Sequence, residues 1–336
     1  MVGKRFLKSL LSLAVGSMMV LAACSSPSAT TTGGAAGSTT GEKPLKIAMV
    51  ANASIADGGW TTACYRAMVT ASEKNVYESA YSENVPQSDY FTMFKQYADL
   101  GYELIFAPGG QYADSIKELA PLYPNTNFIL LNGTLKDIPN VTNVMPDAKQ
   151  IGLLAGALAG LQTKTNSIGF IGGIELDTTK TKLASYEAAA KKVNPAVSVT
   201  HAYAGAFDDS AKGKEIATSM VSTMNVDVMF GDASAVDAGA REGLKTGTNR
   251  YAIAQPGDFL KDDPETIITS ICTDNSALID VCMKDVAAGT FGNKTVYGDL
   301  NNGCLTLGEF GKNCPAEVKT AFLKVVEEIK NGTFIQ

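Results

Sequence analysis

The chain has 336 residues, of which 28 are basic and 34 are acidic, and its formal net charge is −6. This balance offers no basic surplus, so nucleic-acid binding, which depends on a positively charged patch, is not expected. It has a single histidine, His201, and six cysteines without a C-x-x-C pair. A metal site and a histidine-dependent catalytic triad are therefore not expected either.

The N-terminal residues have the pattern of an export signal. Lys4, Arg5 and Lys8 precede a nearly uncharged apolar run at 9–20, and Leu-Ala-Ala-Cys24 follows. A basic head, an apolar stretch of about 7–15 residues and small residues before a cleavage site describe a secretory signal peptide. The run is too short for a membrane span, which needs about 20 residues.

The cysteine directly after Leu-Ala-Ala makes this pattern that of a bacterial lipoprotein, with a plain signal peptide as the alternative. We expect residues 1–23 to be removed and Cys24 to carry acyl chains such as palmitate. The mature chain is then expected to be lipid-anchored on the extracytoplasmic face of the cell membrane.

Residues 24–43 are rich in Ser, Thr and Gly and lack aromatic and large aliphatic side chains. Such segments behave as flexible coils, so we expect a tether here. The rest of the chain, from residue 44 onward, exceeds the usual size of a single core, which predicts two lobes.

Along this body, short apolar runs alternate with longer helical patterns. The predicted strands are 46–50, 104–107, 128–131, 167–171, 197–203, 228–230 and 251–254. The predicted helices are 60–74, 112–122, 147–162, 182–193, 210–224, 275–288 and 315–331. Alternating strands and helices predict an α/β fold with parallel sheets, here in two runs joined near 145–147. Ligands of such sheets bind beyond the carboxyl ends of the strands, where Gly-rich loops follow several of them.

Five cysteines remain once Cys24 carries lipid, and disulfides form in exported chains. Cys304 and Cys314 bracket a short Gly-containing stretch, so we predict a local disulfide between them. Cys64 is expected to be a buried thiol on a helix, and His201 a strand residue. No nucleophile elbow, Walker A loop or complete dinucleotide fingerprint is present, and we expect no enzyme activity and no cofactor.

Four segments carry a resemblance to a known family. They are 152–165 (GLLAGALAGLQTKT), 168–173 (IGFIGG), 189–195 (AAKKVNP) and 206–217 (AFDDSAKGKEIA). They resemble the basic membrane protein family, whose members are substrate-binding lipoproteins of ABC transporters and include purine nucleoside receptors. The resemblance covers about residues 45–332. It implies a type I periplasmic-binding-protein fold with two Rossmann-like lobes joined by a hinge of three crossings. We expect lobe 1 over 44–147 and 265–297, and lobe 2 over 148–264 and 298–336.

The best-understood members of the family bind nucleosides in the interlobe cleft, where aromatic side chains sandwich the base and carboxylate and basic groups hold the ribose hydroxyls. The resemblance implies that Trp60 and Phe207 are the two aromatics and that Asp258 accepts hydrogen bonds from a sugar. A core Trp, a core Phe and a turn Asp are the respective alternatives. The family's usual Lys after the Thr-Ser strand end is absent, and Thr273 or a neighbour stands there. The further candidate ligand-binding residues are Asn52, Asp57, Gln111 and Asp232.

The expected function is the capture of a small solute, best matched by a purine nucleoside, for an ABC importer. The expected partners are this ligand, the permease subunits and the membrane through the N-terminal lipid. We expect a monomer that binds no nucleic acid. The alternatives are a sensory or adhesive surface lipoprotein of the same fold, or a different small ligand such as a sugar.

Overall fold

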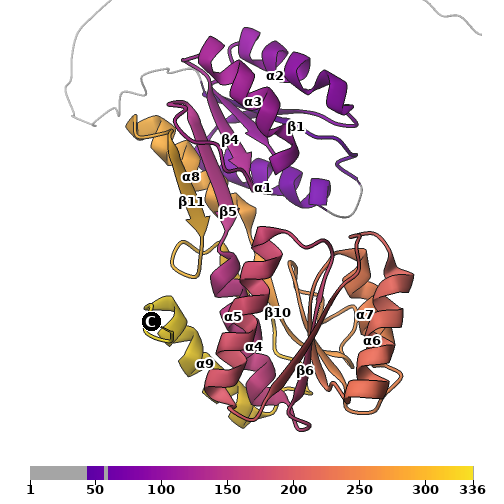
Figure 1. Cartoon of the computed structure of the whole chain (residues 1–336). Coiled ribbons are helices and arrows are strands. Elements are labelled where there is room, and N and C mark those ends of the chain that lie inside the picture. The colour runs from indigo at the N-terminus through magenta and orange to yellow at the C-terminus, as the bar shows by residue number, and fades with distance from the viewer. Residues whose placement is uncertain (1–43, 57–59, 336) are drawn as a thin grey trace, which may run out of the picture. The chain divides into compact units, whose positions relative to one another are not determined.

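The structure is a computed structural model that describes residues 44–56 and 60–335. Over these residues the chain forms two six-stranded sheets flanked by helices (Figure 1). The predicted signal peptide, the tether with Cys24, and Asp57 all lie outside the described residues. Within the described part, none of the helices combines the length and the apolar character that a membrane span requires.

The first sheet is parallel throughout and has the strand order β11-β5-β4-β3-β1-β2. Its strands are β1 (Lys46–Val50), β2 (Glu78–Ser82), β3 (Leu104–Ala107), β4 (Asn127–Leu131), β5 (Val141–Pro146) and β11 (Lys294–Gly298). Its helices are α1 (Trp60–Asn75), α2 (Tyr90–Asp99), α3 (Ala113–Leu119) and α8 (Asn275–Ala288), with short 3₁₀ turns at η1 (Gln87–Asp89), η2 (Gly110–Tyr112) and η3 (Ala120–Leu122).

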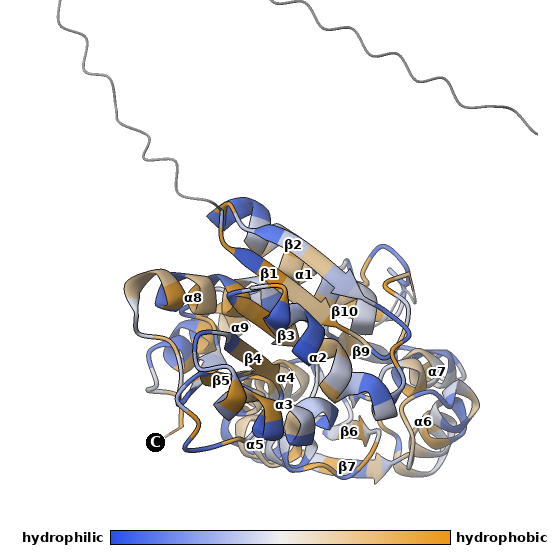
Figure 2. Cartoon of the chain, turned by 90° about the horizontal axis from the view of Figure 1, so that it is seen from above, coloured by the Kyte–Doolittle hydropathy of each residue, from blue (hydrophilic) through white to orange (hydrophobic). Residues whose placement is uncertain are grey.

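The residues of β1 alternate between two cores. Ile47 and Met49 pack in one cluster with α1 and α8, whereas Ala48 and Val50 pack in a second cluster with α2 and α3. A strand that is covered on both faces becomes a continuous apolar run, which is why β1 and β4 stand out as hydrophobic in Figure 2. Cys64 is fully buried on α1, as predicted.

The second sheet has the order β12-β10-β9-β8-β6-β7, and only β12 runs antiparallel to its neighbour. Its strands are β6 (Ser167–Gly172), β7 (Ser198–Tyr203), β8 (Val228–Asp232), β9 (Tyr251–Ala254), β10 (Ile267–Thr273) and β12 (Leu305–Leu307). Helices α4 (Ala148–Gln162), α5 (Asp177–Val193) and α9 (Ala316–Lys330) share one core with this sheet, and α6 (Ser210–Met224) and α7 (Ala235–Leu244) share the other. His201 is exposed on β7.

Helix α4 is buried along nearly its whole length because three glycines let α5 approach it closely. A Cβ on Gly156 would lie 2.0 Å from the carbonyl oxygen of Tyr186, and one on Gly152 would lie 2.3 Å from that of Lys182. At Gly160 the nearest α5 backbone atom would be 2.9 Å away. The Gly-x-x-x-Gly-x-x-x-Gly spacing in the sequence is therefore a helix-packing stripe.

The chain passes between the two sheets at three places, and these crossings are hydrogen-bonded to one another. The N–H of Asp147, between β5 and α4, donates to the carbonyl of Gly298 at 2.7 Å. The N–H of Asp274, between β10 and α8, donates to the carbonyl of Cys304 at 2.7 Å. Both aspartate side chains also accept an N–H at the start of the helix that follows. The two crossings that lead into helices are thus N-caps, which fixes where the chain turns there.

One predicted lobe boundary is wrong. Residues 267–273 were expected in the first lobe, but they form β10, which pairs with β9 and β12 in the second sheet. The chain returns to the first sheet only at Asp274, which caps α8. The physical reason is that β10, whose first five residues are buried, completes the second sheet between β12 and β9 before the crossing occurs.

The predicted disulfide between Cys304 and Cys314 is also wrong, because both thiols are free. Cys304 is buried in the first-sheet core beside Leu278 and Cys282, whereas Cys314 packs against the second-sheet core that contains Phe322. The segment between them leads from one core to the other, so a short separation in sequence does not bring the two sulfur atoms together. Burial raises the pKa of the Cys304 thiol to about 12, which keeps it protonated.

Candidate ligand-binding site

The predicted site residues that the structure describes lie at the carboxyl edges of the two sheets. Asn52 follows β1 and Gln111 follows β3 in the first sheet. Phe207 follows β7, Asp232 ends β8 and Asp258 follows β9 in the second sheet. This is the edge at which open α/β sheets bind ligands. The described residues include no cluster of three or more His, Cys, Asp or Glu side chains placed to hold a metal ion.

Trp60 is the first residue of α1 and is 39 % exposed, which argues against the alternative of a core tryptophan. Its indole Nε1–H donates to the carbonyl oxygen of Pro108 at 2.7 Å, in the loop after β3. This bond satisfies the only polar group of the ring and fixes the ring in place. What the side chain still offers is its flat, polarisable face.

The loop after β1 is held by a buried tyrosine. The Tyr112 hydroxyl accepts the N–H of Asn52 at 2.9 Å and donates to Asn52 Oδ1 at 3.1 Å. Burial raises the pKa of Tyr112, so this hydroxyl stays protonated and remains a donor. The neighbouring Gln111 side chain is exposed and lies close over Gly109, where a Cβ would be 2.1 Å from Gln111 Oε1. Asn52 and Gln111 therefore present amide groups at this edge.

Phe207 is 37 % exposed and packs against the end of β6. A Cβ on Gly173 would lie 2.4 Å from its ring, so only glycine leaves room for the ring at that position. The carbonyl of Phe207 accepts the N–H groups of Ala235 at 2.9 Å and Val236 at 3.3 Å, at the start of α7. The ring is thus positioned by two elements and keeps a free face, unlike a core phenylalanine.

Asp232 is the centre of a polar cluster on the second sheet. Lys182 Nζ lies 2.6 Å from Asp232 Oδ1, and the two side chains are only 15 % and 14 % exposed. Gln255 Nε2 donates to the same Oδ1 at 2.7 Å and to the carbonyl of Gly231 at 2.8 Å. Charge-assisted hydrogen bonds of this length are the stronger kind. The cluster presents a paired carboxylate and ammonium at the strand ends.

Asp258 is engaged by its own loop. Its Oδ2 accepts the N–H of Glu309 at 2.9 Å, and its Oδ1 accepts the N–H of Leu260 at 3.2 Å and the Ser270 hydroxyl at 3.4 Å. This is the bonding of a turn aspartate, which is the alternative set against a ligand role. A ligand role for Asp258 stays a prediction.

A buried ion pair lies beneath the cluster. Asp237 on α7 bonds Arg241 Nη1 at 3.2 Å, and the two side chains are 9 % and 15 % exposed. Desolvation raises the pKa of Asp237 to about 6 in spite of the arginine. The carboxylate sits over Gly231, where a Cβ would be 1.5 Å from Asp237 Oδ1.

Sequence reasoning missed Lys182, Gln255 and Asp237 as parts of this site. Lys182 was expected at the start of a helix, but α5 begins at Asp177, so Lys182 stands in its second turn. Helix α7, which carries Asp237, was not predicted at all. One clue was available. In a parallel α/β fold, the first residues of the helix that follows a strand lie at that strand's carboxyl end, beside the expected ligand site.

Residues 45–335 match the family of ABC transporter substrate-binding proteins described as PnrA-like, also called Bmp. The chain belongs to this family. The predicted resemblance to the basic membrane protein family is confirmed, and the family is a class of solute-binding proteins of ABC transporters rather than of enzymes.

Two named relatives illustrate the likeness. The ABC transporter nucleoside-binding protein BmpA of Lactococcus lactis is 28 % identical over 345 residues, covering 96 % of this chain and 95 % of the relative. The CD4+ T-cell-stimulating antigen of Listeria innocua is 28 % identical, with coverages of 97 % and 96 %.

The solved structures support the fold. An ABC transporter solute-binding protein from Conexibacter woesei has a TM-score of 0.69 at 20 % identity, covering 87 % of this chain and 98 % of that one. A transcriptional activator of the comK gene from Bacillus halodurans has a TM-score of 0.76 at 22 % identity, with coverages of 87 % and 100 %. The type I periplasmic-binding-protein fold predicted from the sequence is therefore confirmed.

Proposed function

We propose that this chain captures a purine nucleoside for an ABC importer, as a lipid-anchored protein on the extracytoplasmic face of the membrane. The observation that carries the proposal is the pair of half-exposed aromatic rings, Trp60 and Phe207, at the carboxyl edges of different sheets. The name of the Lactococcus lactis relative, a nucleoside-binding protein, points to the same ligand class.

The proposed ligand bridges the two edges. A purine base stacks on Trp60 from the first sheet and on Phe207 from the second, and base–aromatic stacking contributes roughly 1–3 kcal/mol per base. The exposed amides of Asn52 and Gln111 offer a donor and an acceptor each for the edge of the base. Ligand contact on both lobes favours hinge closure, which is the usual response of two-lobed binding proteins.

The ribose hydroxyls have matching partners in the Asp232 cluster. Asp232 Oδ2, which neither Lys182 nor Gln255 uses, accepts from a hydroxyl, and the Lys182 ammonium donates to its neighbour. Lys182 thereby supplies the positive charge that the family's missing Lys would provide at Thr273. Because the charges of Lys182 and Asp232 cancel, the cluster suits an uncharged polyol better than a phosphate ester.

The direct test of the ligand class is the small molecule that co-purifies with the chain, released by denaturation and identified by mass spectrometry. We expect a purine nucleoside. A sugar would reject the nucleoside while keeping the binding role. Loss of nucleoside uptake in a strain lacking the chain would separate transport from a sensory or adhesive role.

The anchor has its own test. Replacing the acceptor thiol with Cys24→Ser should abolish incorporation of labelled fatty acid and release the chain from the membrane pellet or leave it unprocessed. A variant that still incorporates label would reject the lipid anchor without bearing on the ligand.

A further inference from the structure

The three most exposed large apolar side chains that the structure describes lie at one edge of the first sheet. Val76, Leu100 and Leu122 are 76 %, 66 % and 64 % exposed. They precede β2, β3 and β4, and the strand order places β1 between β3 and β2. Since these strands are parallel, the three side chains lie at the amino edge of the sheet, with Val76 after α1 on one face and Leu100 and Leu122 at the ends of α2 and η3 on the other. We call these three residues the amino-edge row.

Val76 is locally unfavourable in two ways. It has a φ of 59°, in the left-handed region where a β-branched side chain is strained, and it is also the most exposed of the row. It follows the last residue of α1, where the N–H of Tyr77 reaches back to the carbonyl of Ser72 at 2.9 Å. Glycine or asparagine is the ordinary choice at such a helix end. An exposed valine there points to a partner outside the chain.

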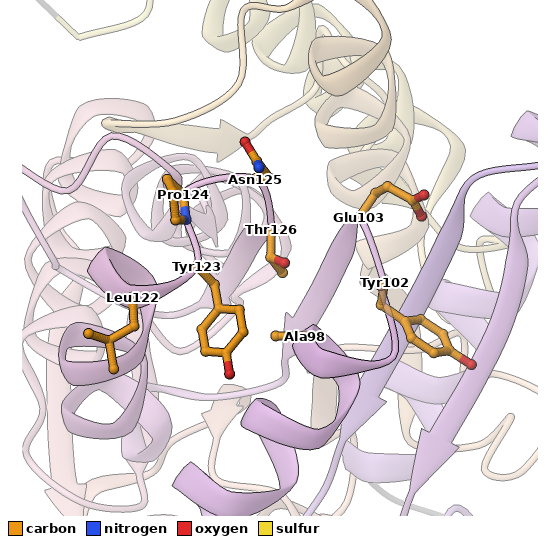
Figure 3. Close-up of a pocket in the computed structure, with 9 residues that line it drawn as sticks. Ala98, Tyr102, Glu103, Leu122, Tyr123, Pro124, Asn125 and Thr126 are labelled. Carbon is orange, nitrogen blue, oxygen red and sulfur yellow. The ribbon is translucent and has the colours of Figure 1, made fainter.

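A pocket of about 440 Å³ opens at the same edge and contains Leu122, Tyr102 and Tyr123 (Figure 3). Figure 3 shows the two tyrosines on either side of Ala98. Lys46 Nζ lies 5.4 Å from the centre of the Tyr102 ring, and Lys95 Nζ lies 5.9 Å from that of Tyr123. The edge also carries carboxylates, since Lys95 Nζ lies 2.6 Å from Asp99 Oδ2 and Glu103 lines the pocket. Apolar side chains beside tyrosine rings and lysine stems are a composition found at a lipid–water boundary.

The start of the described chain lies at this edge as well. Pro44 comes two residues before β1, so residues 24–43 join the body between the strands that Leu100 and Val76 precede. If residues 24–43 form the predicted tether, a coil of that length would have an r.m.s. end-to-end distance of about 25 Å. A lipid on Cys24 would therefore keep the amino-edge row within reach of the bilayer, at a high effective concentration.

We infer that the amino-edge row rests on the phospholipid surface and orients the anchored chain. The inference depends on the proposed lipid anchor. The row and the ligand site lie at opposite ends of the same strands, so contact with the membrane leaves the carboxyl edge open to solute.

The chain offers a built-in probe, because Trp60 is its only tryptophan and lies at the carboxyl edge. The full lipoprotein is reconstituted in vesicles of phosphatidylcholine and phosphatidylglycerol that contain brominated phosphatidylcholine, a contact quencher. Three proteins are compared: wild type, Trp60→Phe with Leu122→Trp, and Trp60→Phe with Leu323→Trp. Leu323 is the matched control, since it is 40 % exposed on α9.

Emission from the Leu122→Trp protein should fall by about half or more, because interfacial side chains lie about 5–10 Å into the headgroup boundary. Emission from the wild type and the Leu323→Trp protein should change little. Adding Val76→Asp and Leu100→Asp to the Leu122→Trp protein should restore emission while the chain still pellets with the vesicles. These are surface changes, and a melting curve checks that each variant is folded.

An unquenched Leu122→Trp protein that pellets with the vesicles would overturn the inference and leave the anchor intact. A chain that does not pellet would reject the anchor and the inference together. Equal quenching of the Leu122→Trp and Leu323→Trp proteins would also overturn it, because no single edge would then face the lipid. If the tryptophan of the Leu122→Trp protein becomes shielded from solvent as the protein concentration rises in the absence of vesicles, the amino-edge row contacts a second copy of the chain instead.

Discussion

Lys182 contributes a positive charge to the candidate site although it is 50 residues from Asp232 in sequence. After the Thr-Ser pair at 269–270, where the family usually has a lysine, the chain offers only Thr273, whose N–H donates to the Pro256 carbonyl at 2.8 Å. The charge comes instead from the second turn of α5, and only the packing of α5 beside β8 reveals it. The sequence therefore showed that the family's lysine is missing near Thr273, but not that Lys182 supplies the positive charge instead.

Lys182→Met should weaken nucleoside binding by about one to two decades, because hydrogen bonds to charged groups contribute about 1.5–3 kcal/mol. Lys180→Met is the matched control, since Lys180 lies in the same helix with a looser 3.7 Å contact to Glu175 and both side chains exposed. Titration calorimetry on both variants checks this. Unchanged affinity in Lys182→Met would remove the lysine from the site.

Asp237 predicts a pH dependence of stability. Its folded-state pKa of about 6 lies above the ordinary aspartate value of 3.8, so the folded state binds the proton more tightly than the unfolded state. Stability from this group is therefore present at low pH and is lost as pH rises from about 4 to 6. Relative to Asp237→Asn, the wild type should lose about 2–3 kcal/mol of unfolding free energy over that interval. Urea unfolding at pH 4, 5, 6 and 7 measures the difference; a difference that does not change with pH would contradict it.

At the scale of elements, burial decided what the sequence could predict. The apolar runs of β1, β3 and β4 are covered on both faces, and all were predicted within a residue of their bounds. Strand β2 reads ESAYS and is an edge strand with exposed positions, so it carries no apolar run. Helix α7 reads AVDAGAREGL, and its two glycines weaken the helical pattern. One of them, Gly239, is required because a Cβ there would lie 1.8 Å from the carbonyl of Ser210 on α6.

The contact of α4 with α5 gives the sharpest prediction at this scale. Gly156→Val should destabilise the fold by more than about 3 kcal/mol, because overpacking costs typically 1–3 kcal/mol and here the obstacle is backbone. Ala188→Val is the control, since Ala188 is exposed on α5, and its effect should stay within about 0.5 kcal/mol. Denaturant melts of the two variants test the pair. If Gly156→Val were as stable as Ala188→Val, α5 could move away from α4 at little cost, and the close helix contact would not matter for stability.

At the scale of the molecule, the two-sheet plan follows from the alternation of apolar runs and helical patterns, and the family match bears it out. The crossing at Asp147 was predicted, whereas the one at Asp274 was placed too early because β10 continues the second sheet. Trp60 and Phe207 lie at the carboxyl edges of the two sheets, and their ligand role stays a prediction. Asp258 could not be judged from sequence, since one of the groups that bind it, the N–H of Glu309, comes from 51 positions away.

The central claim is that an aromatic pair binds a purine nucleoside, and Trp60 tests it most directly. Titration calorimetry of adenosine, inosine, guanosine and a set of sugars is carried out on the wild type and on Trp60→Ala, with a thermal melt of each without ligand. We expect nucleosides alone to bind the wild type, and the variant to bind about one to two decades more weakly with a nearly unchanged melt. Truncation of a core tryptophan would instead cost about 3–5 kcal/mol of stability. Sugar binding without any nucleoside signal, or a large loss of stability with unchanged affinity, would contradict the account.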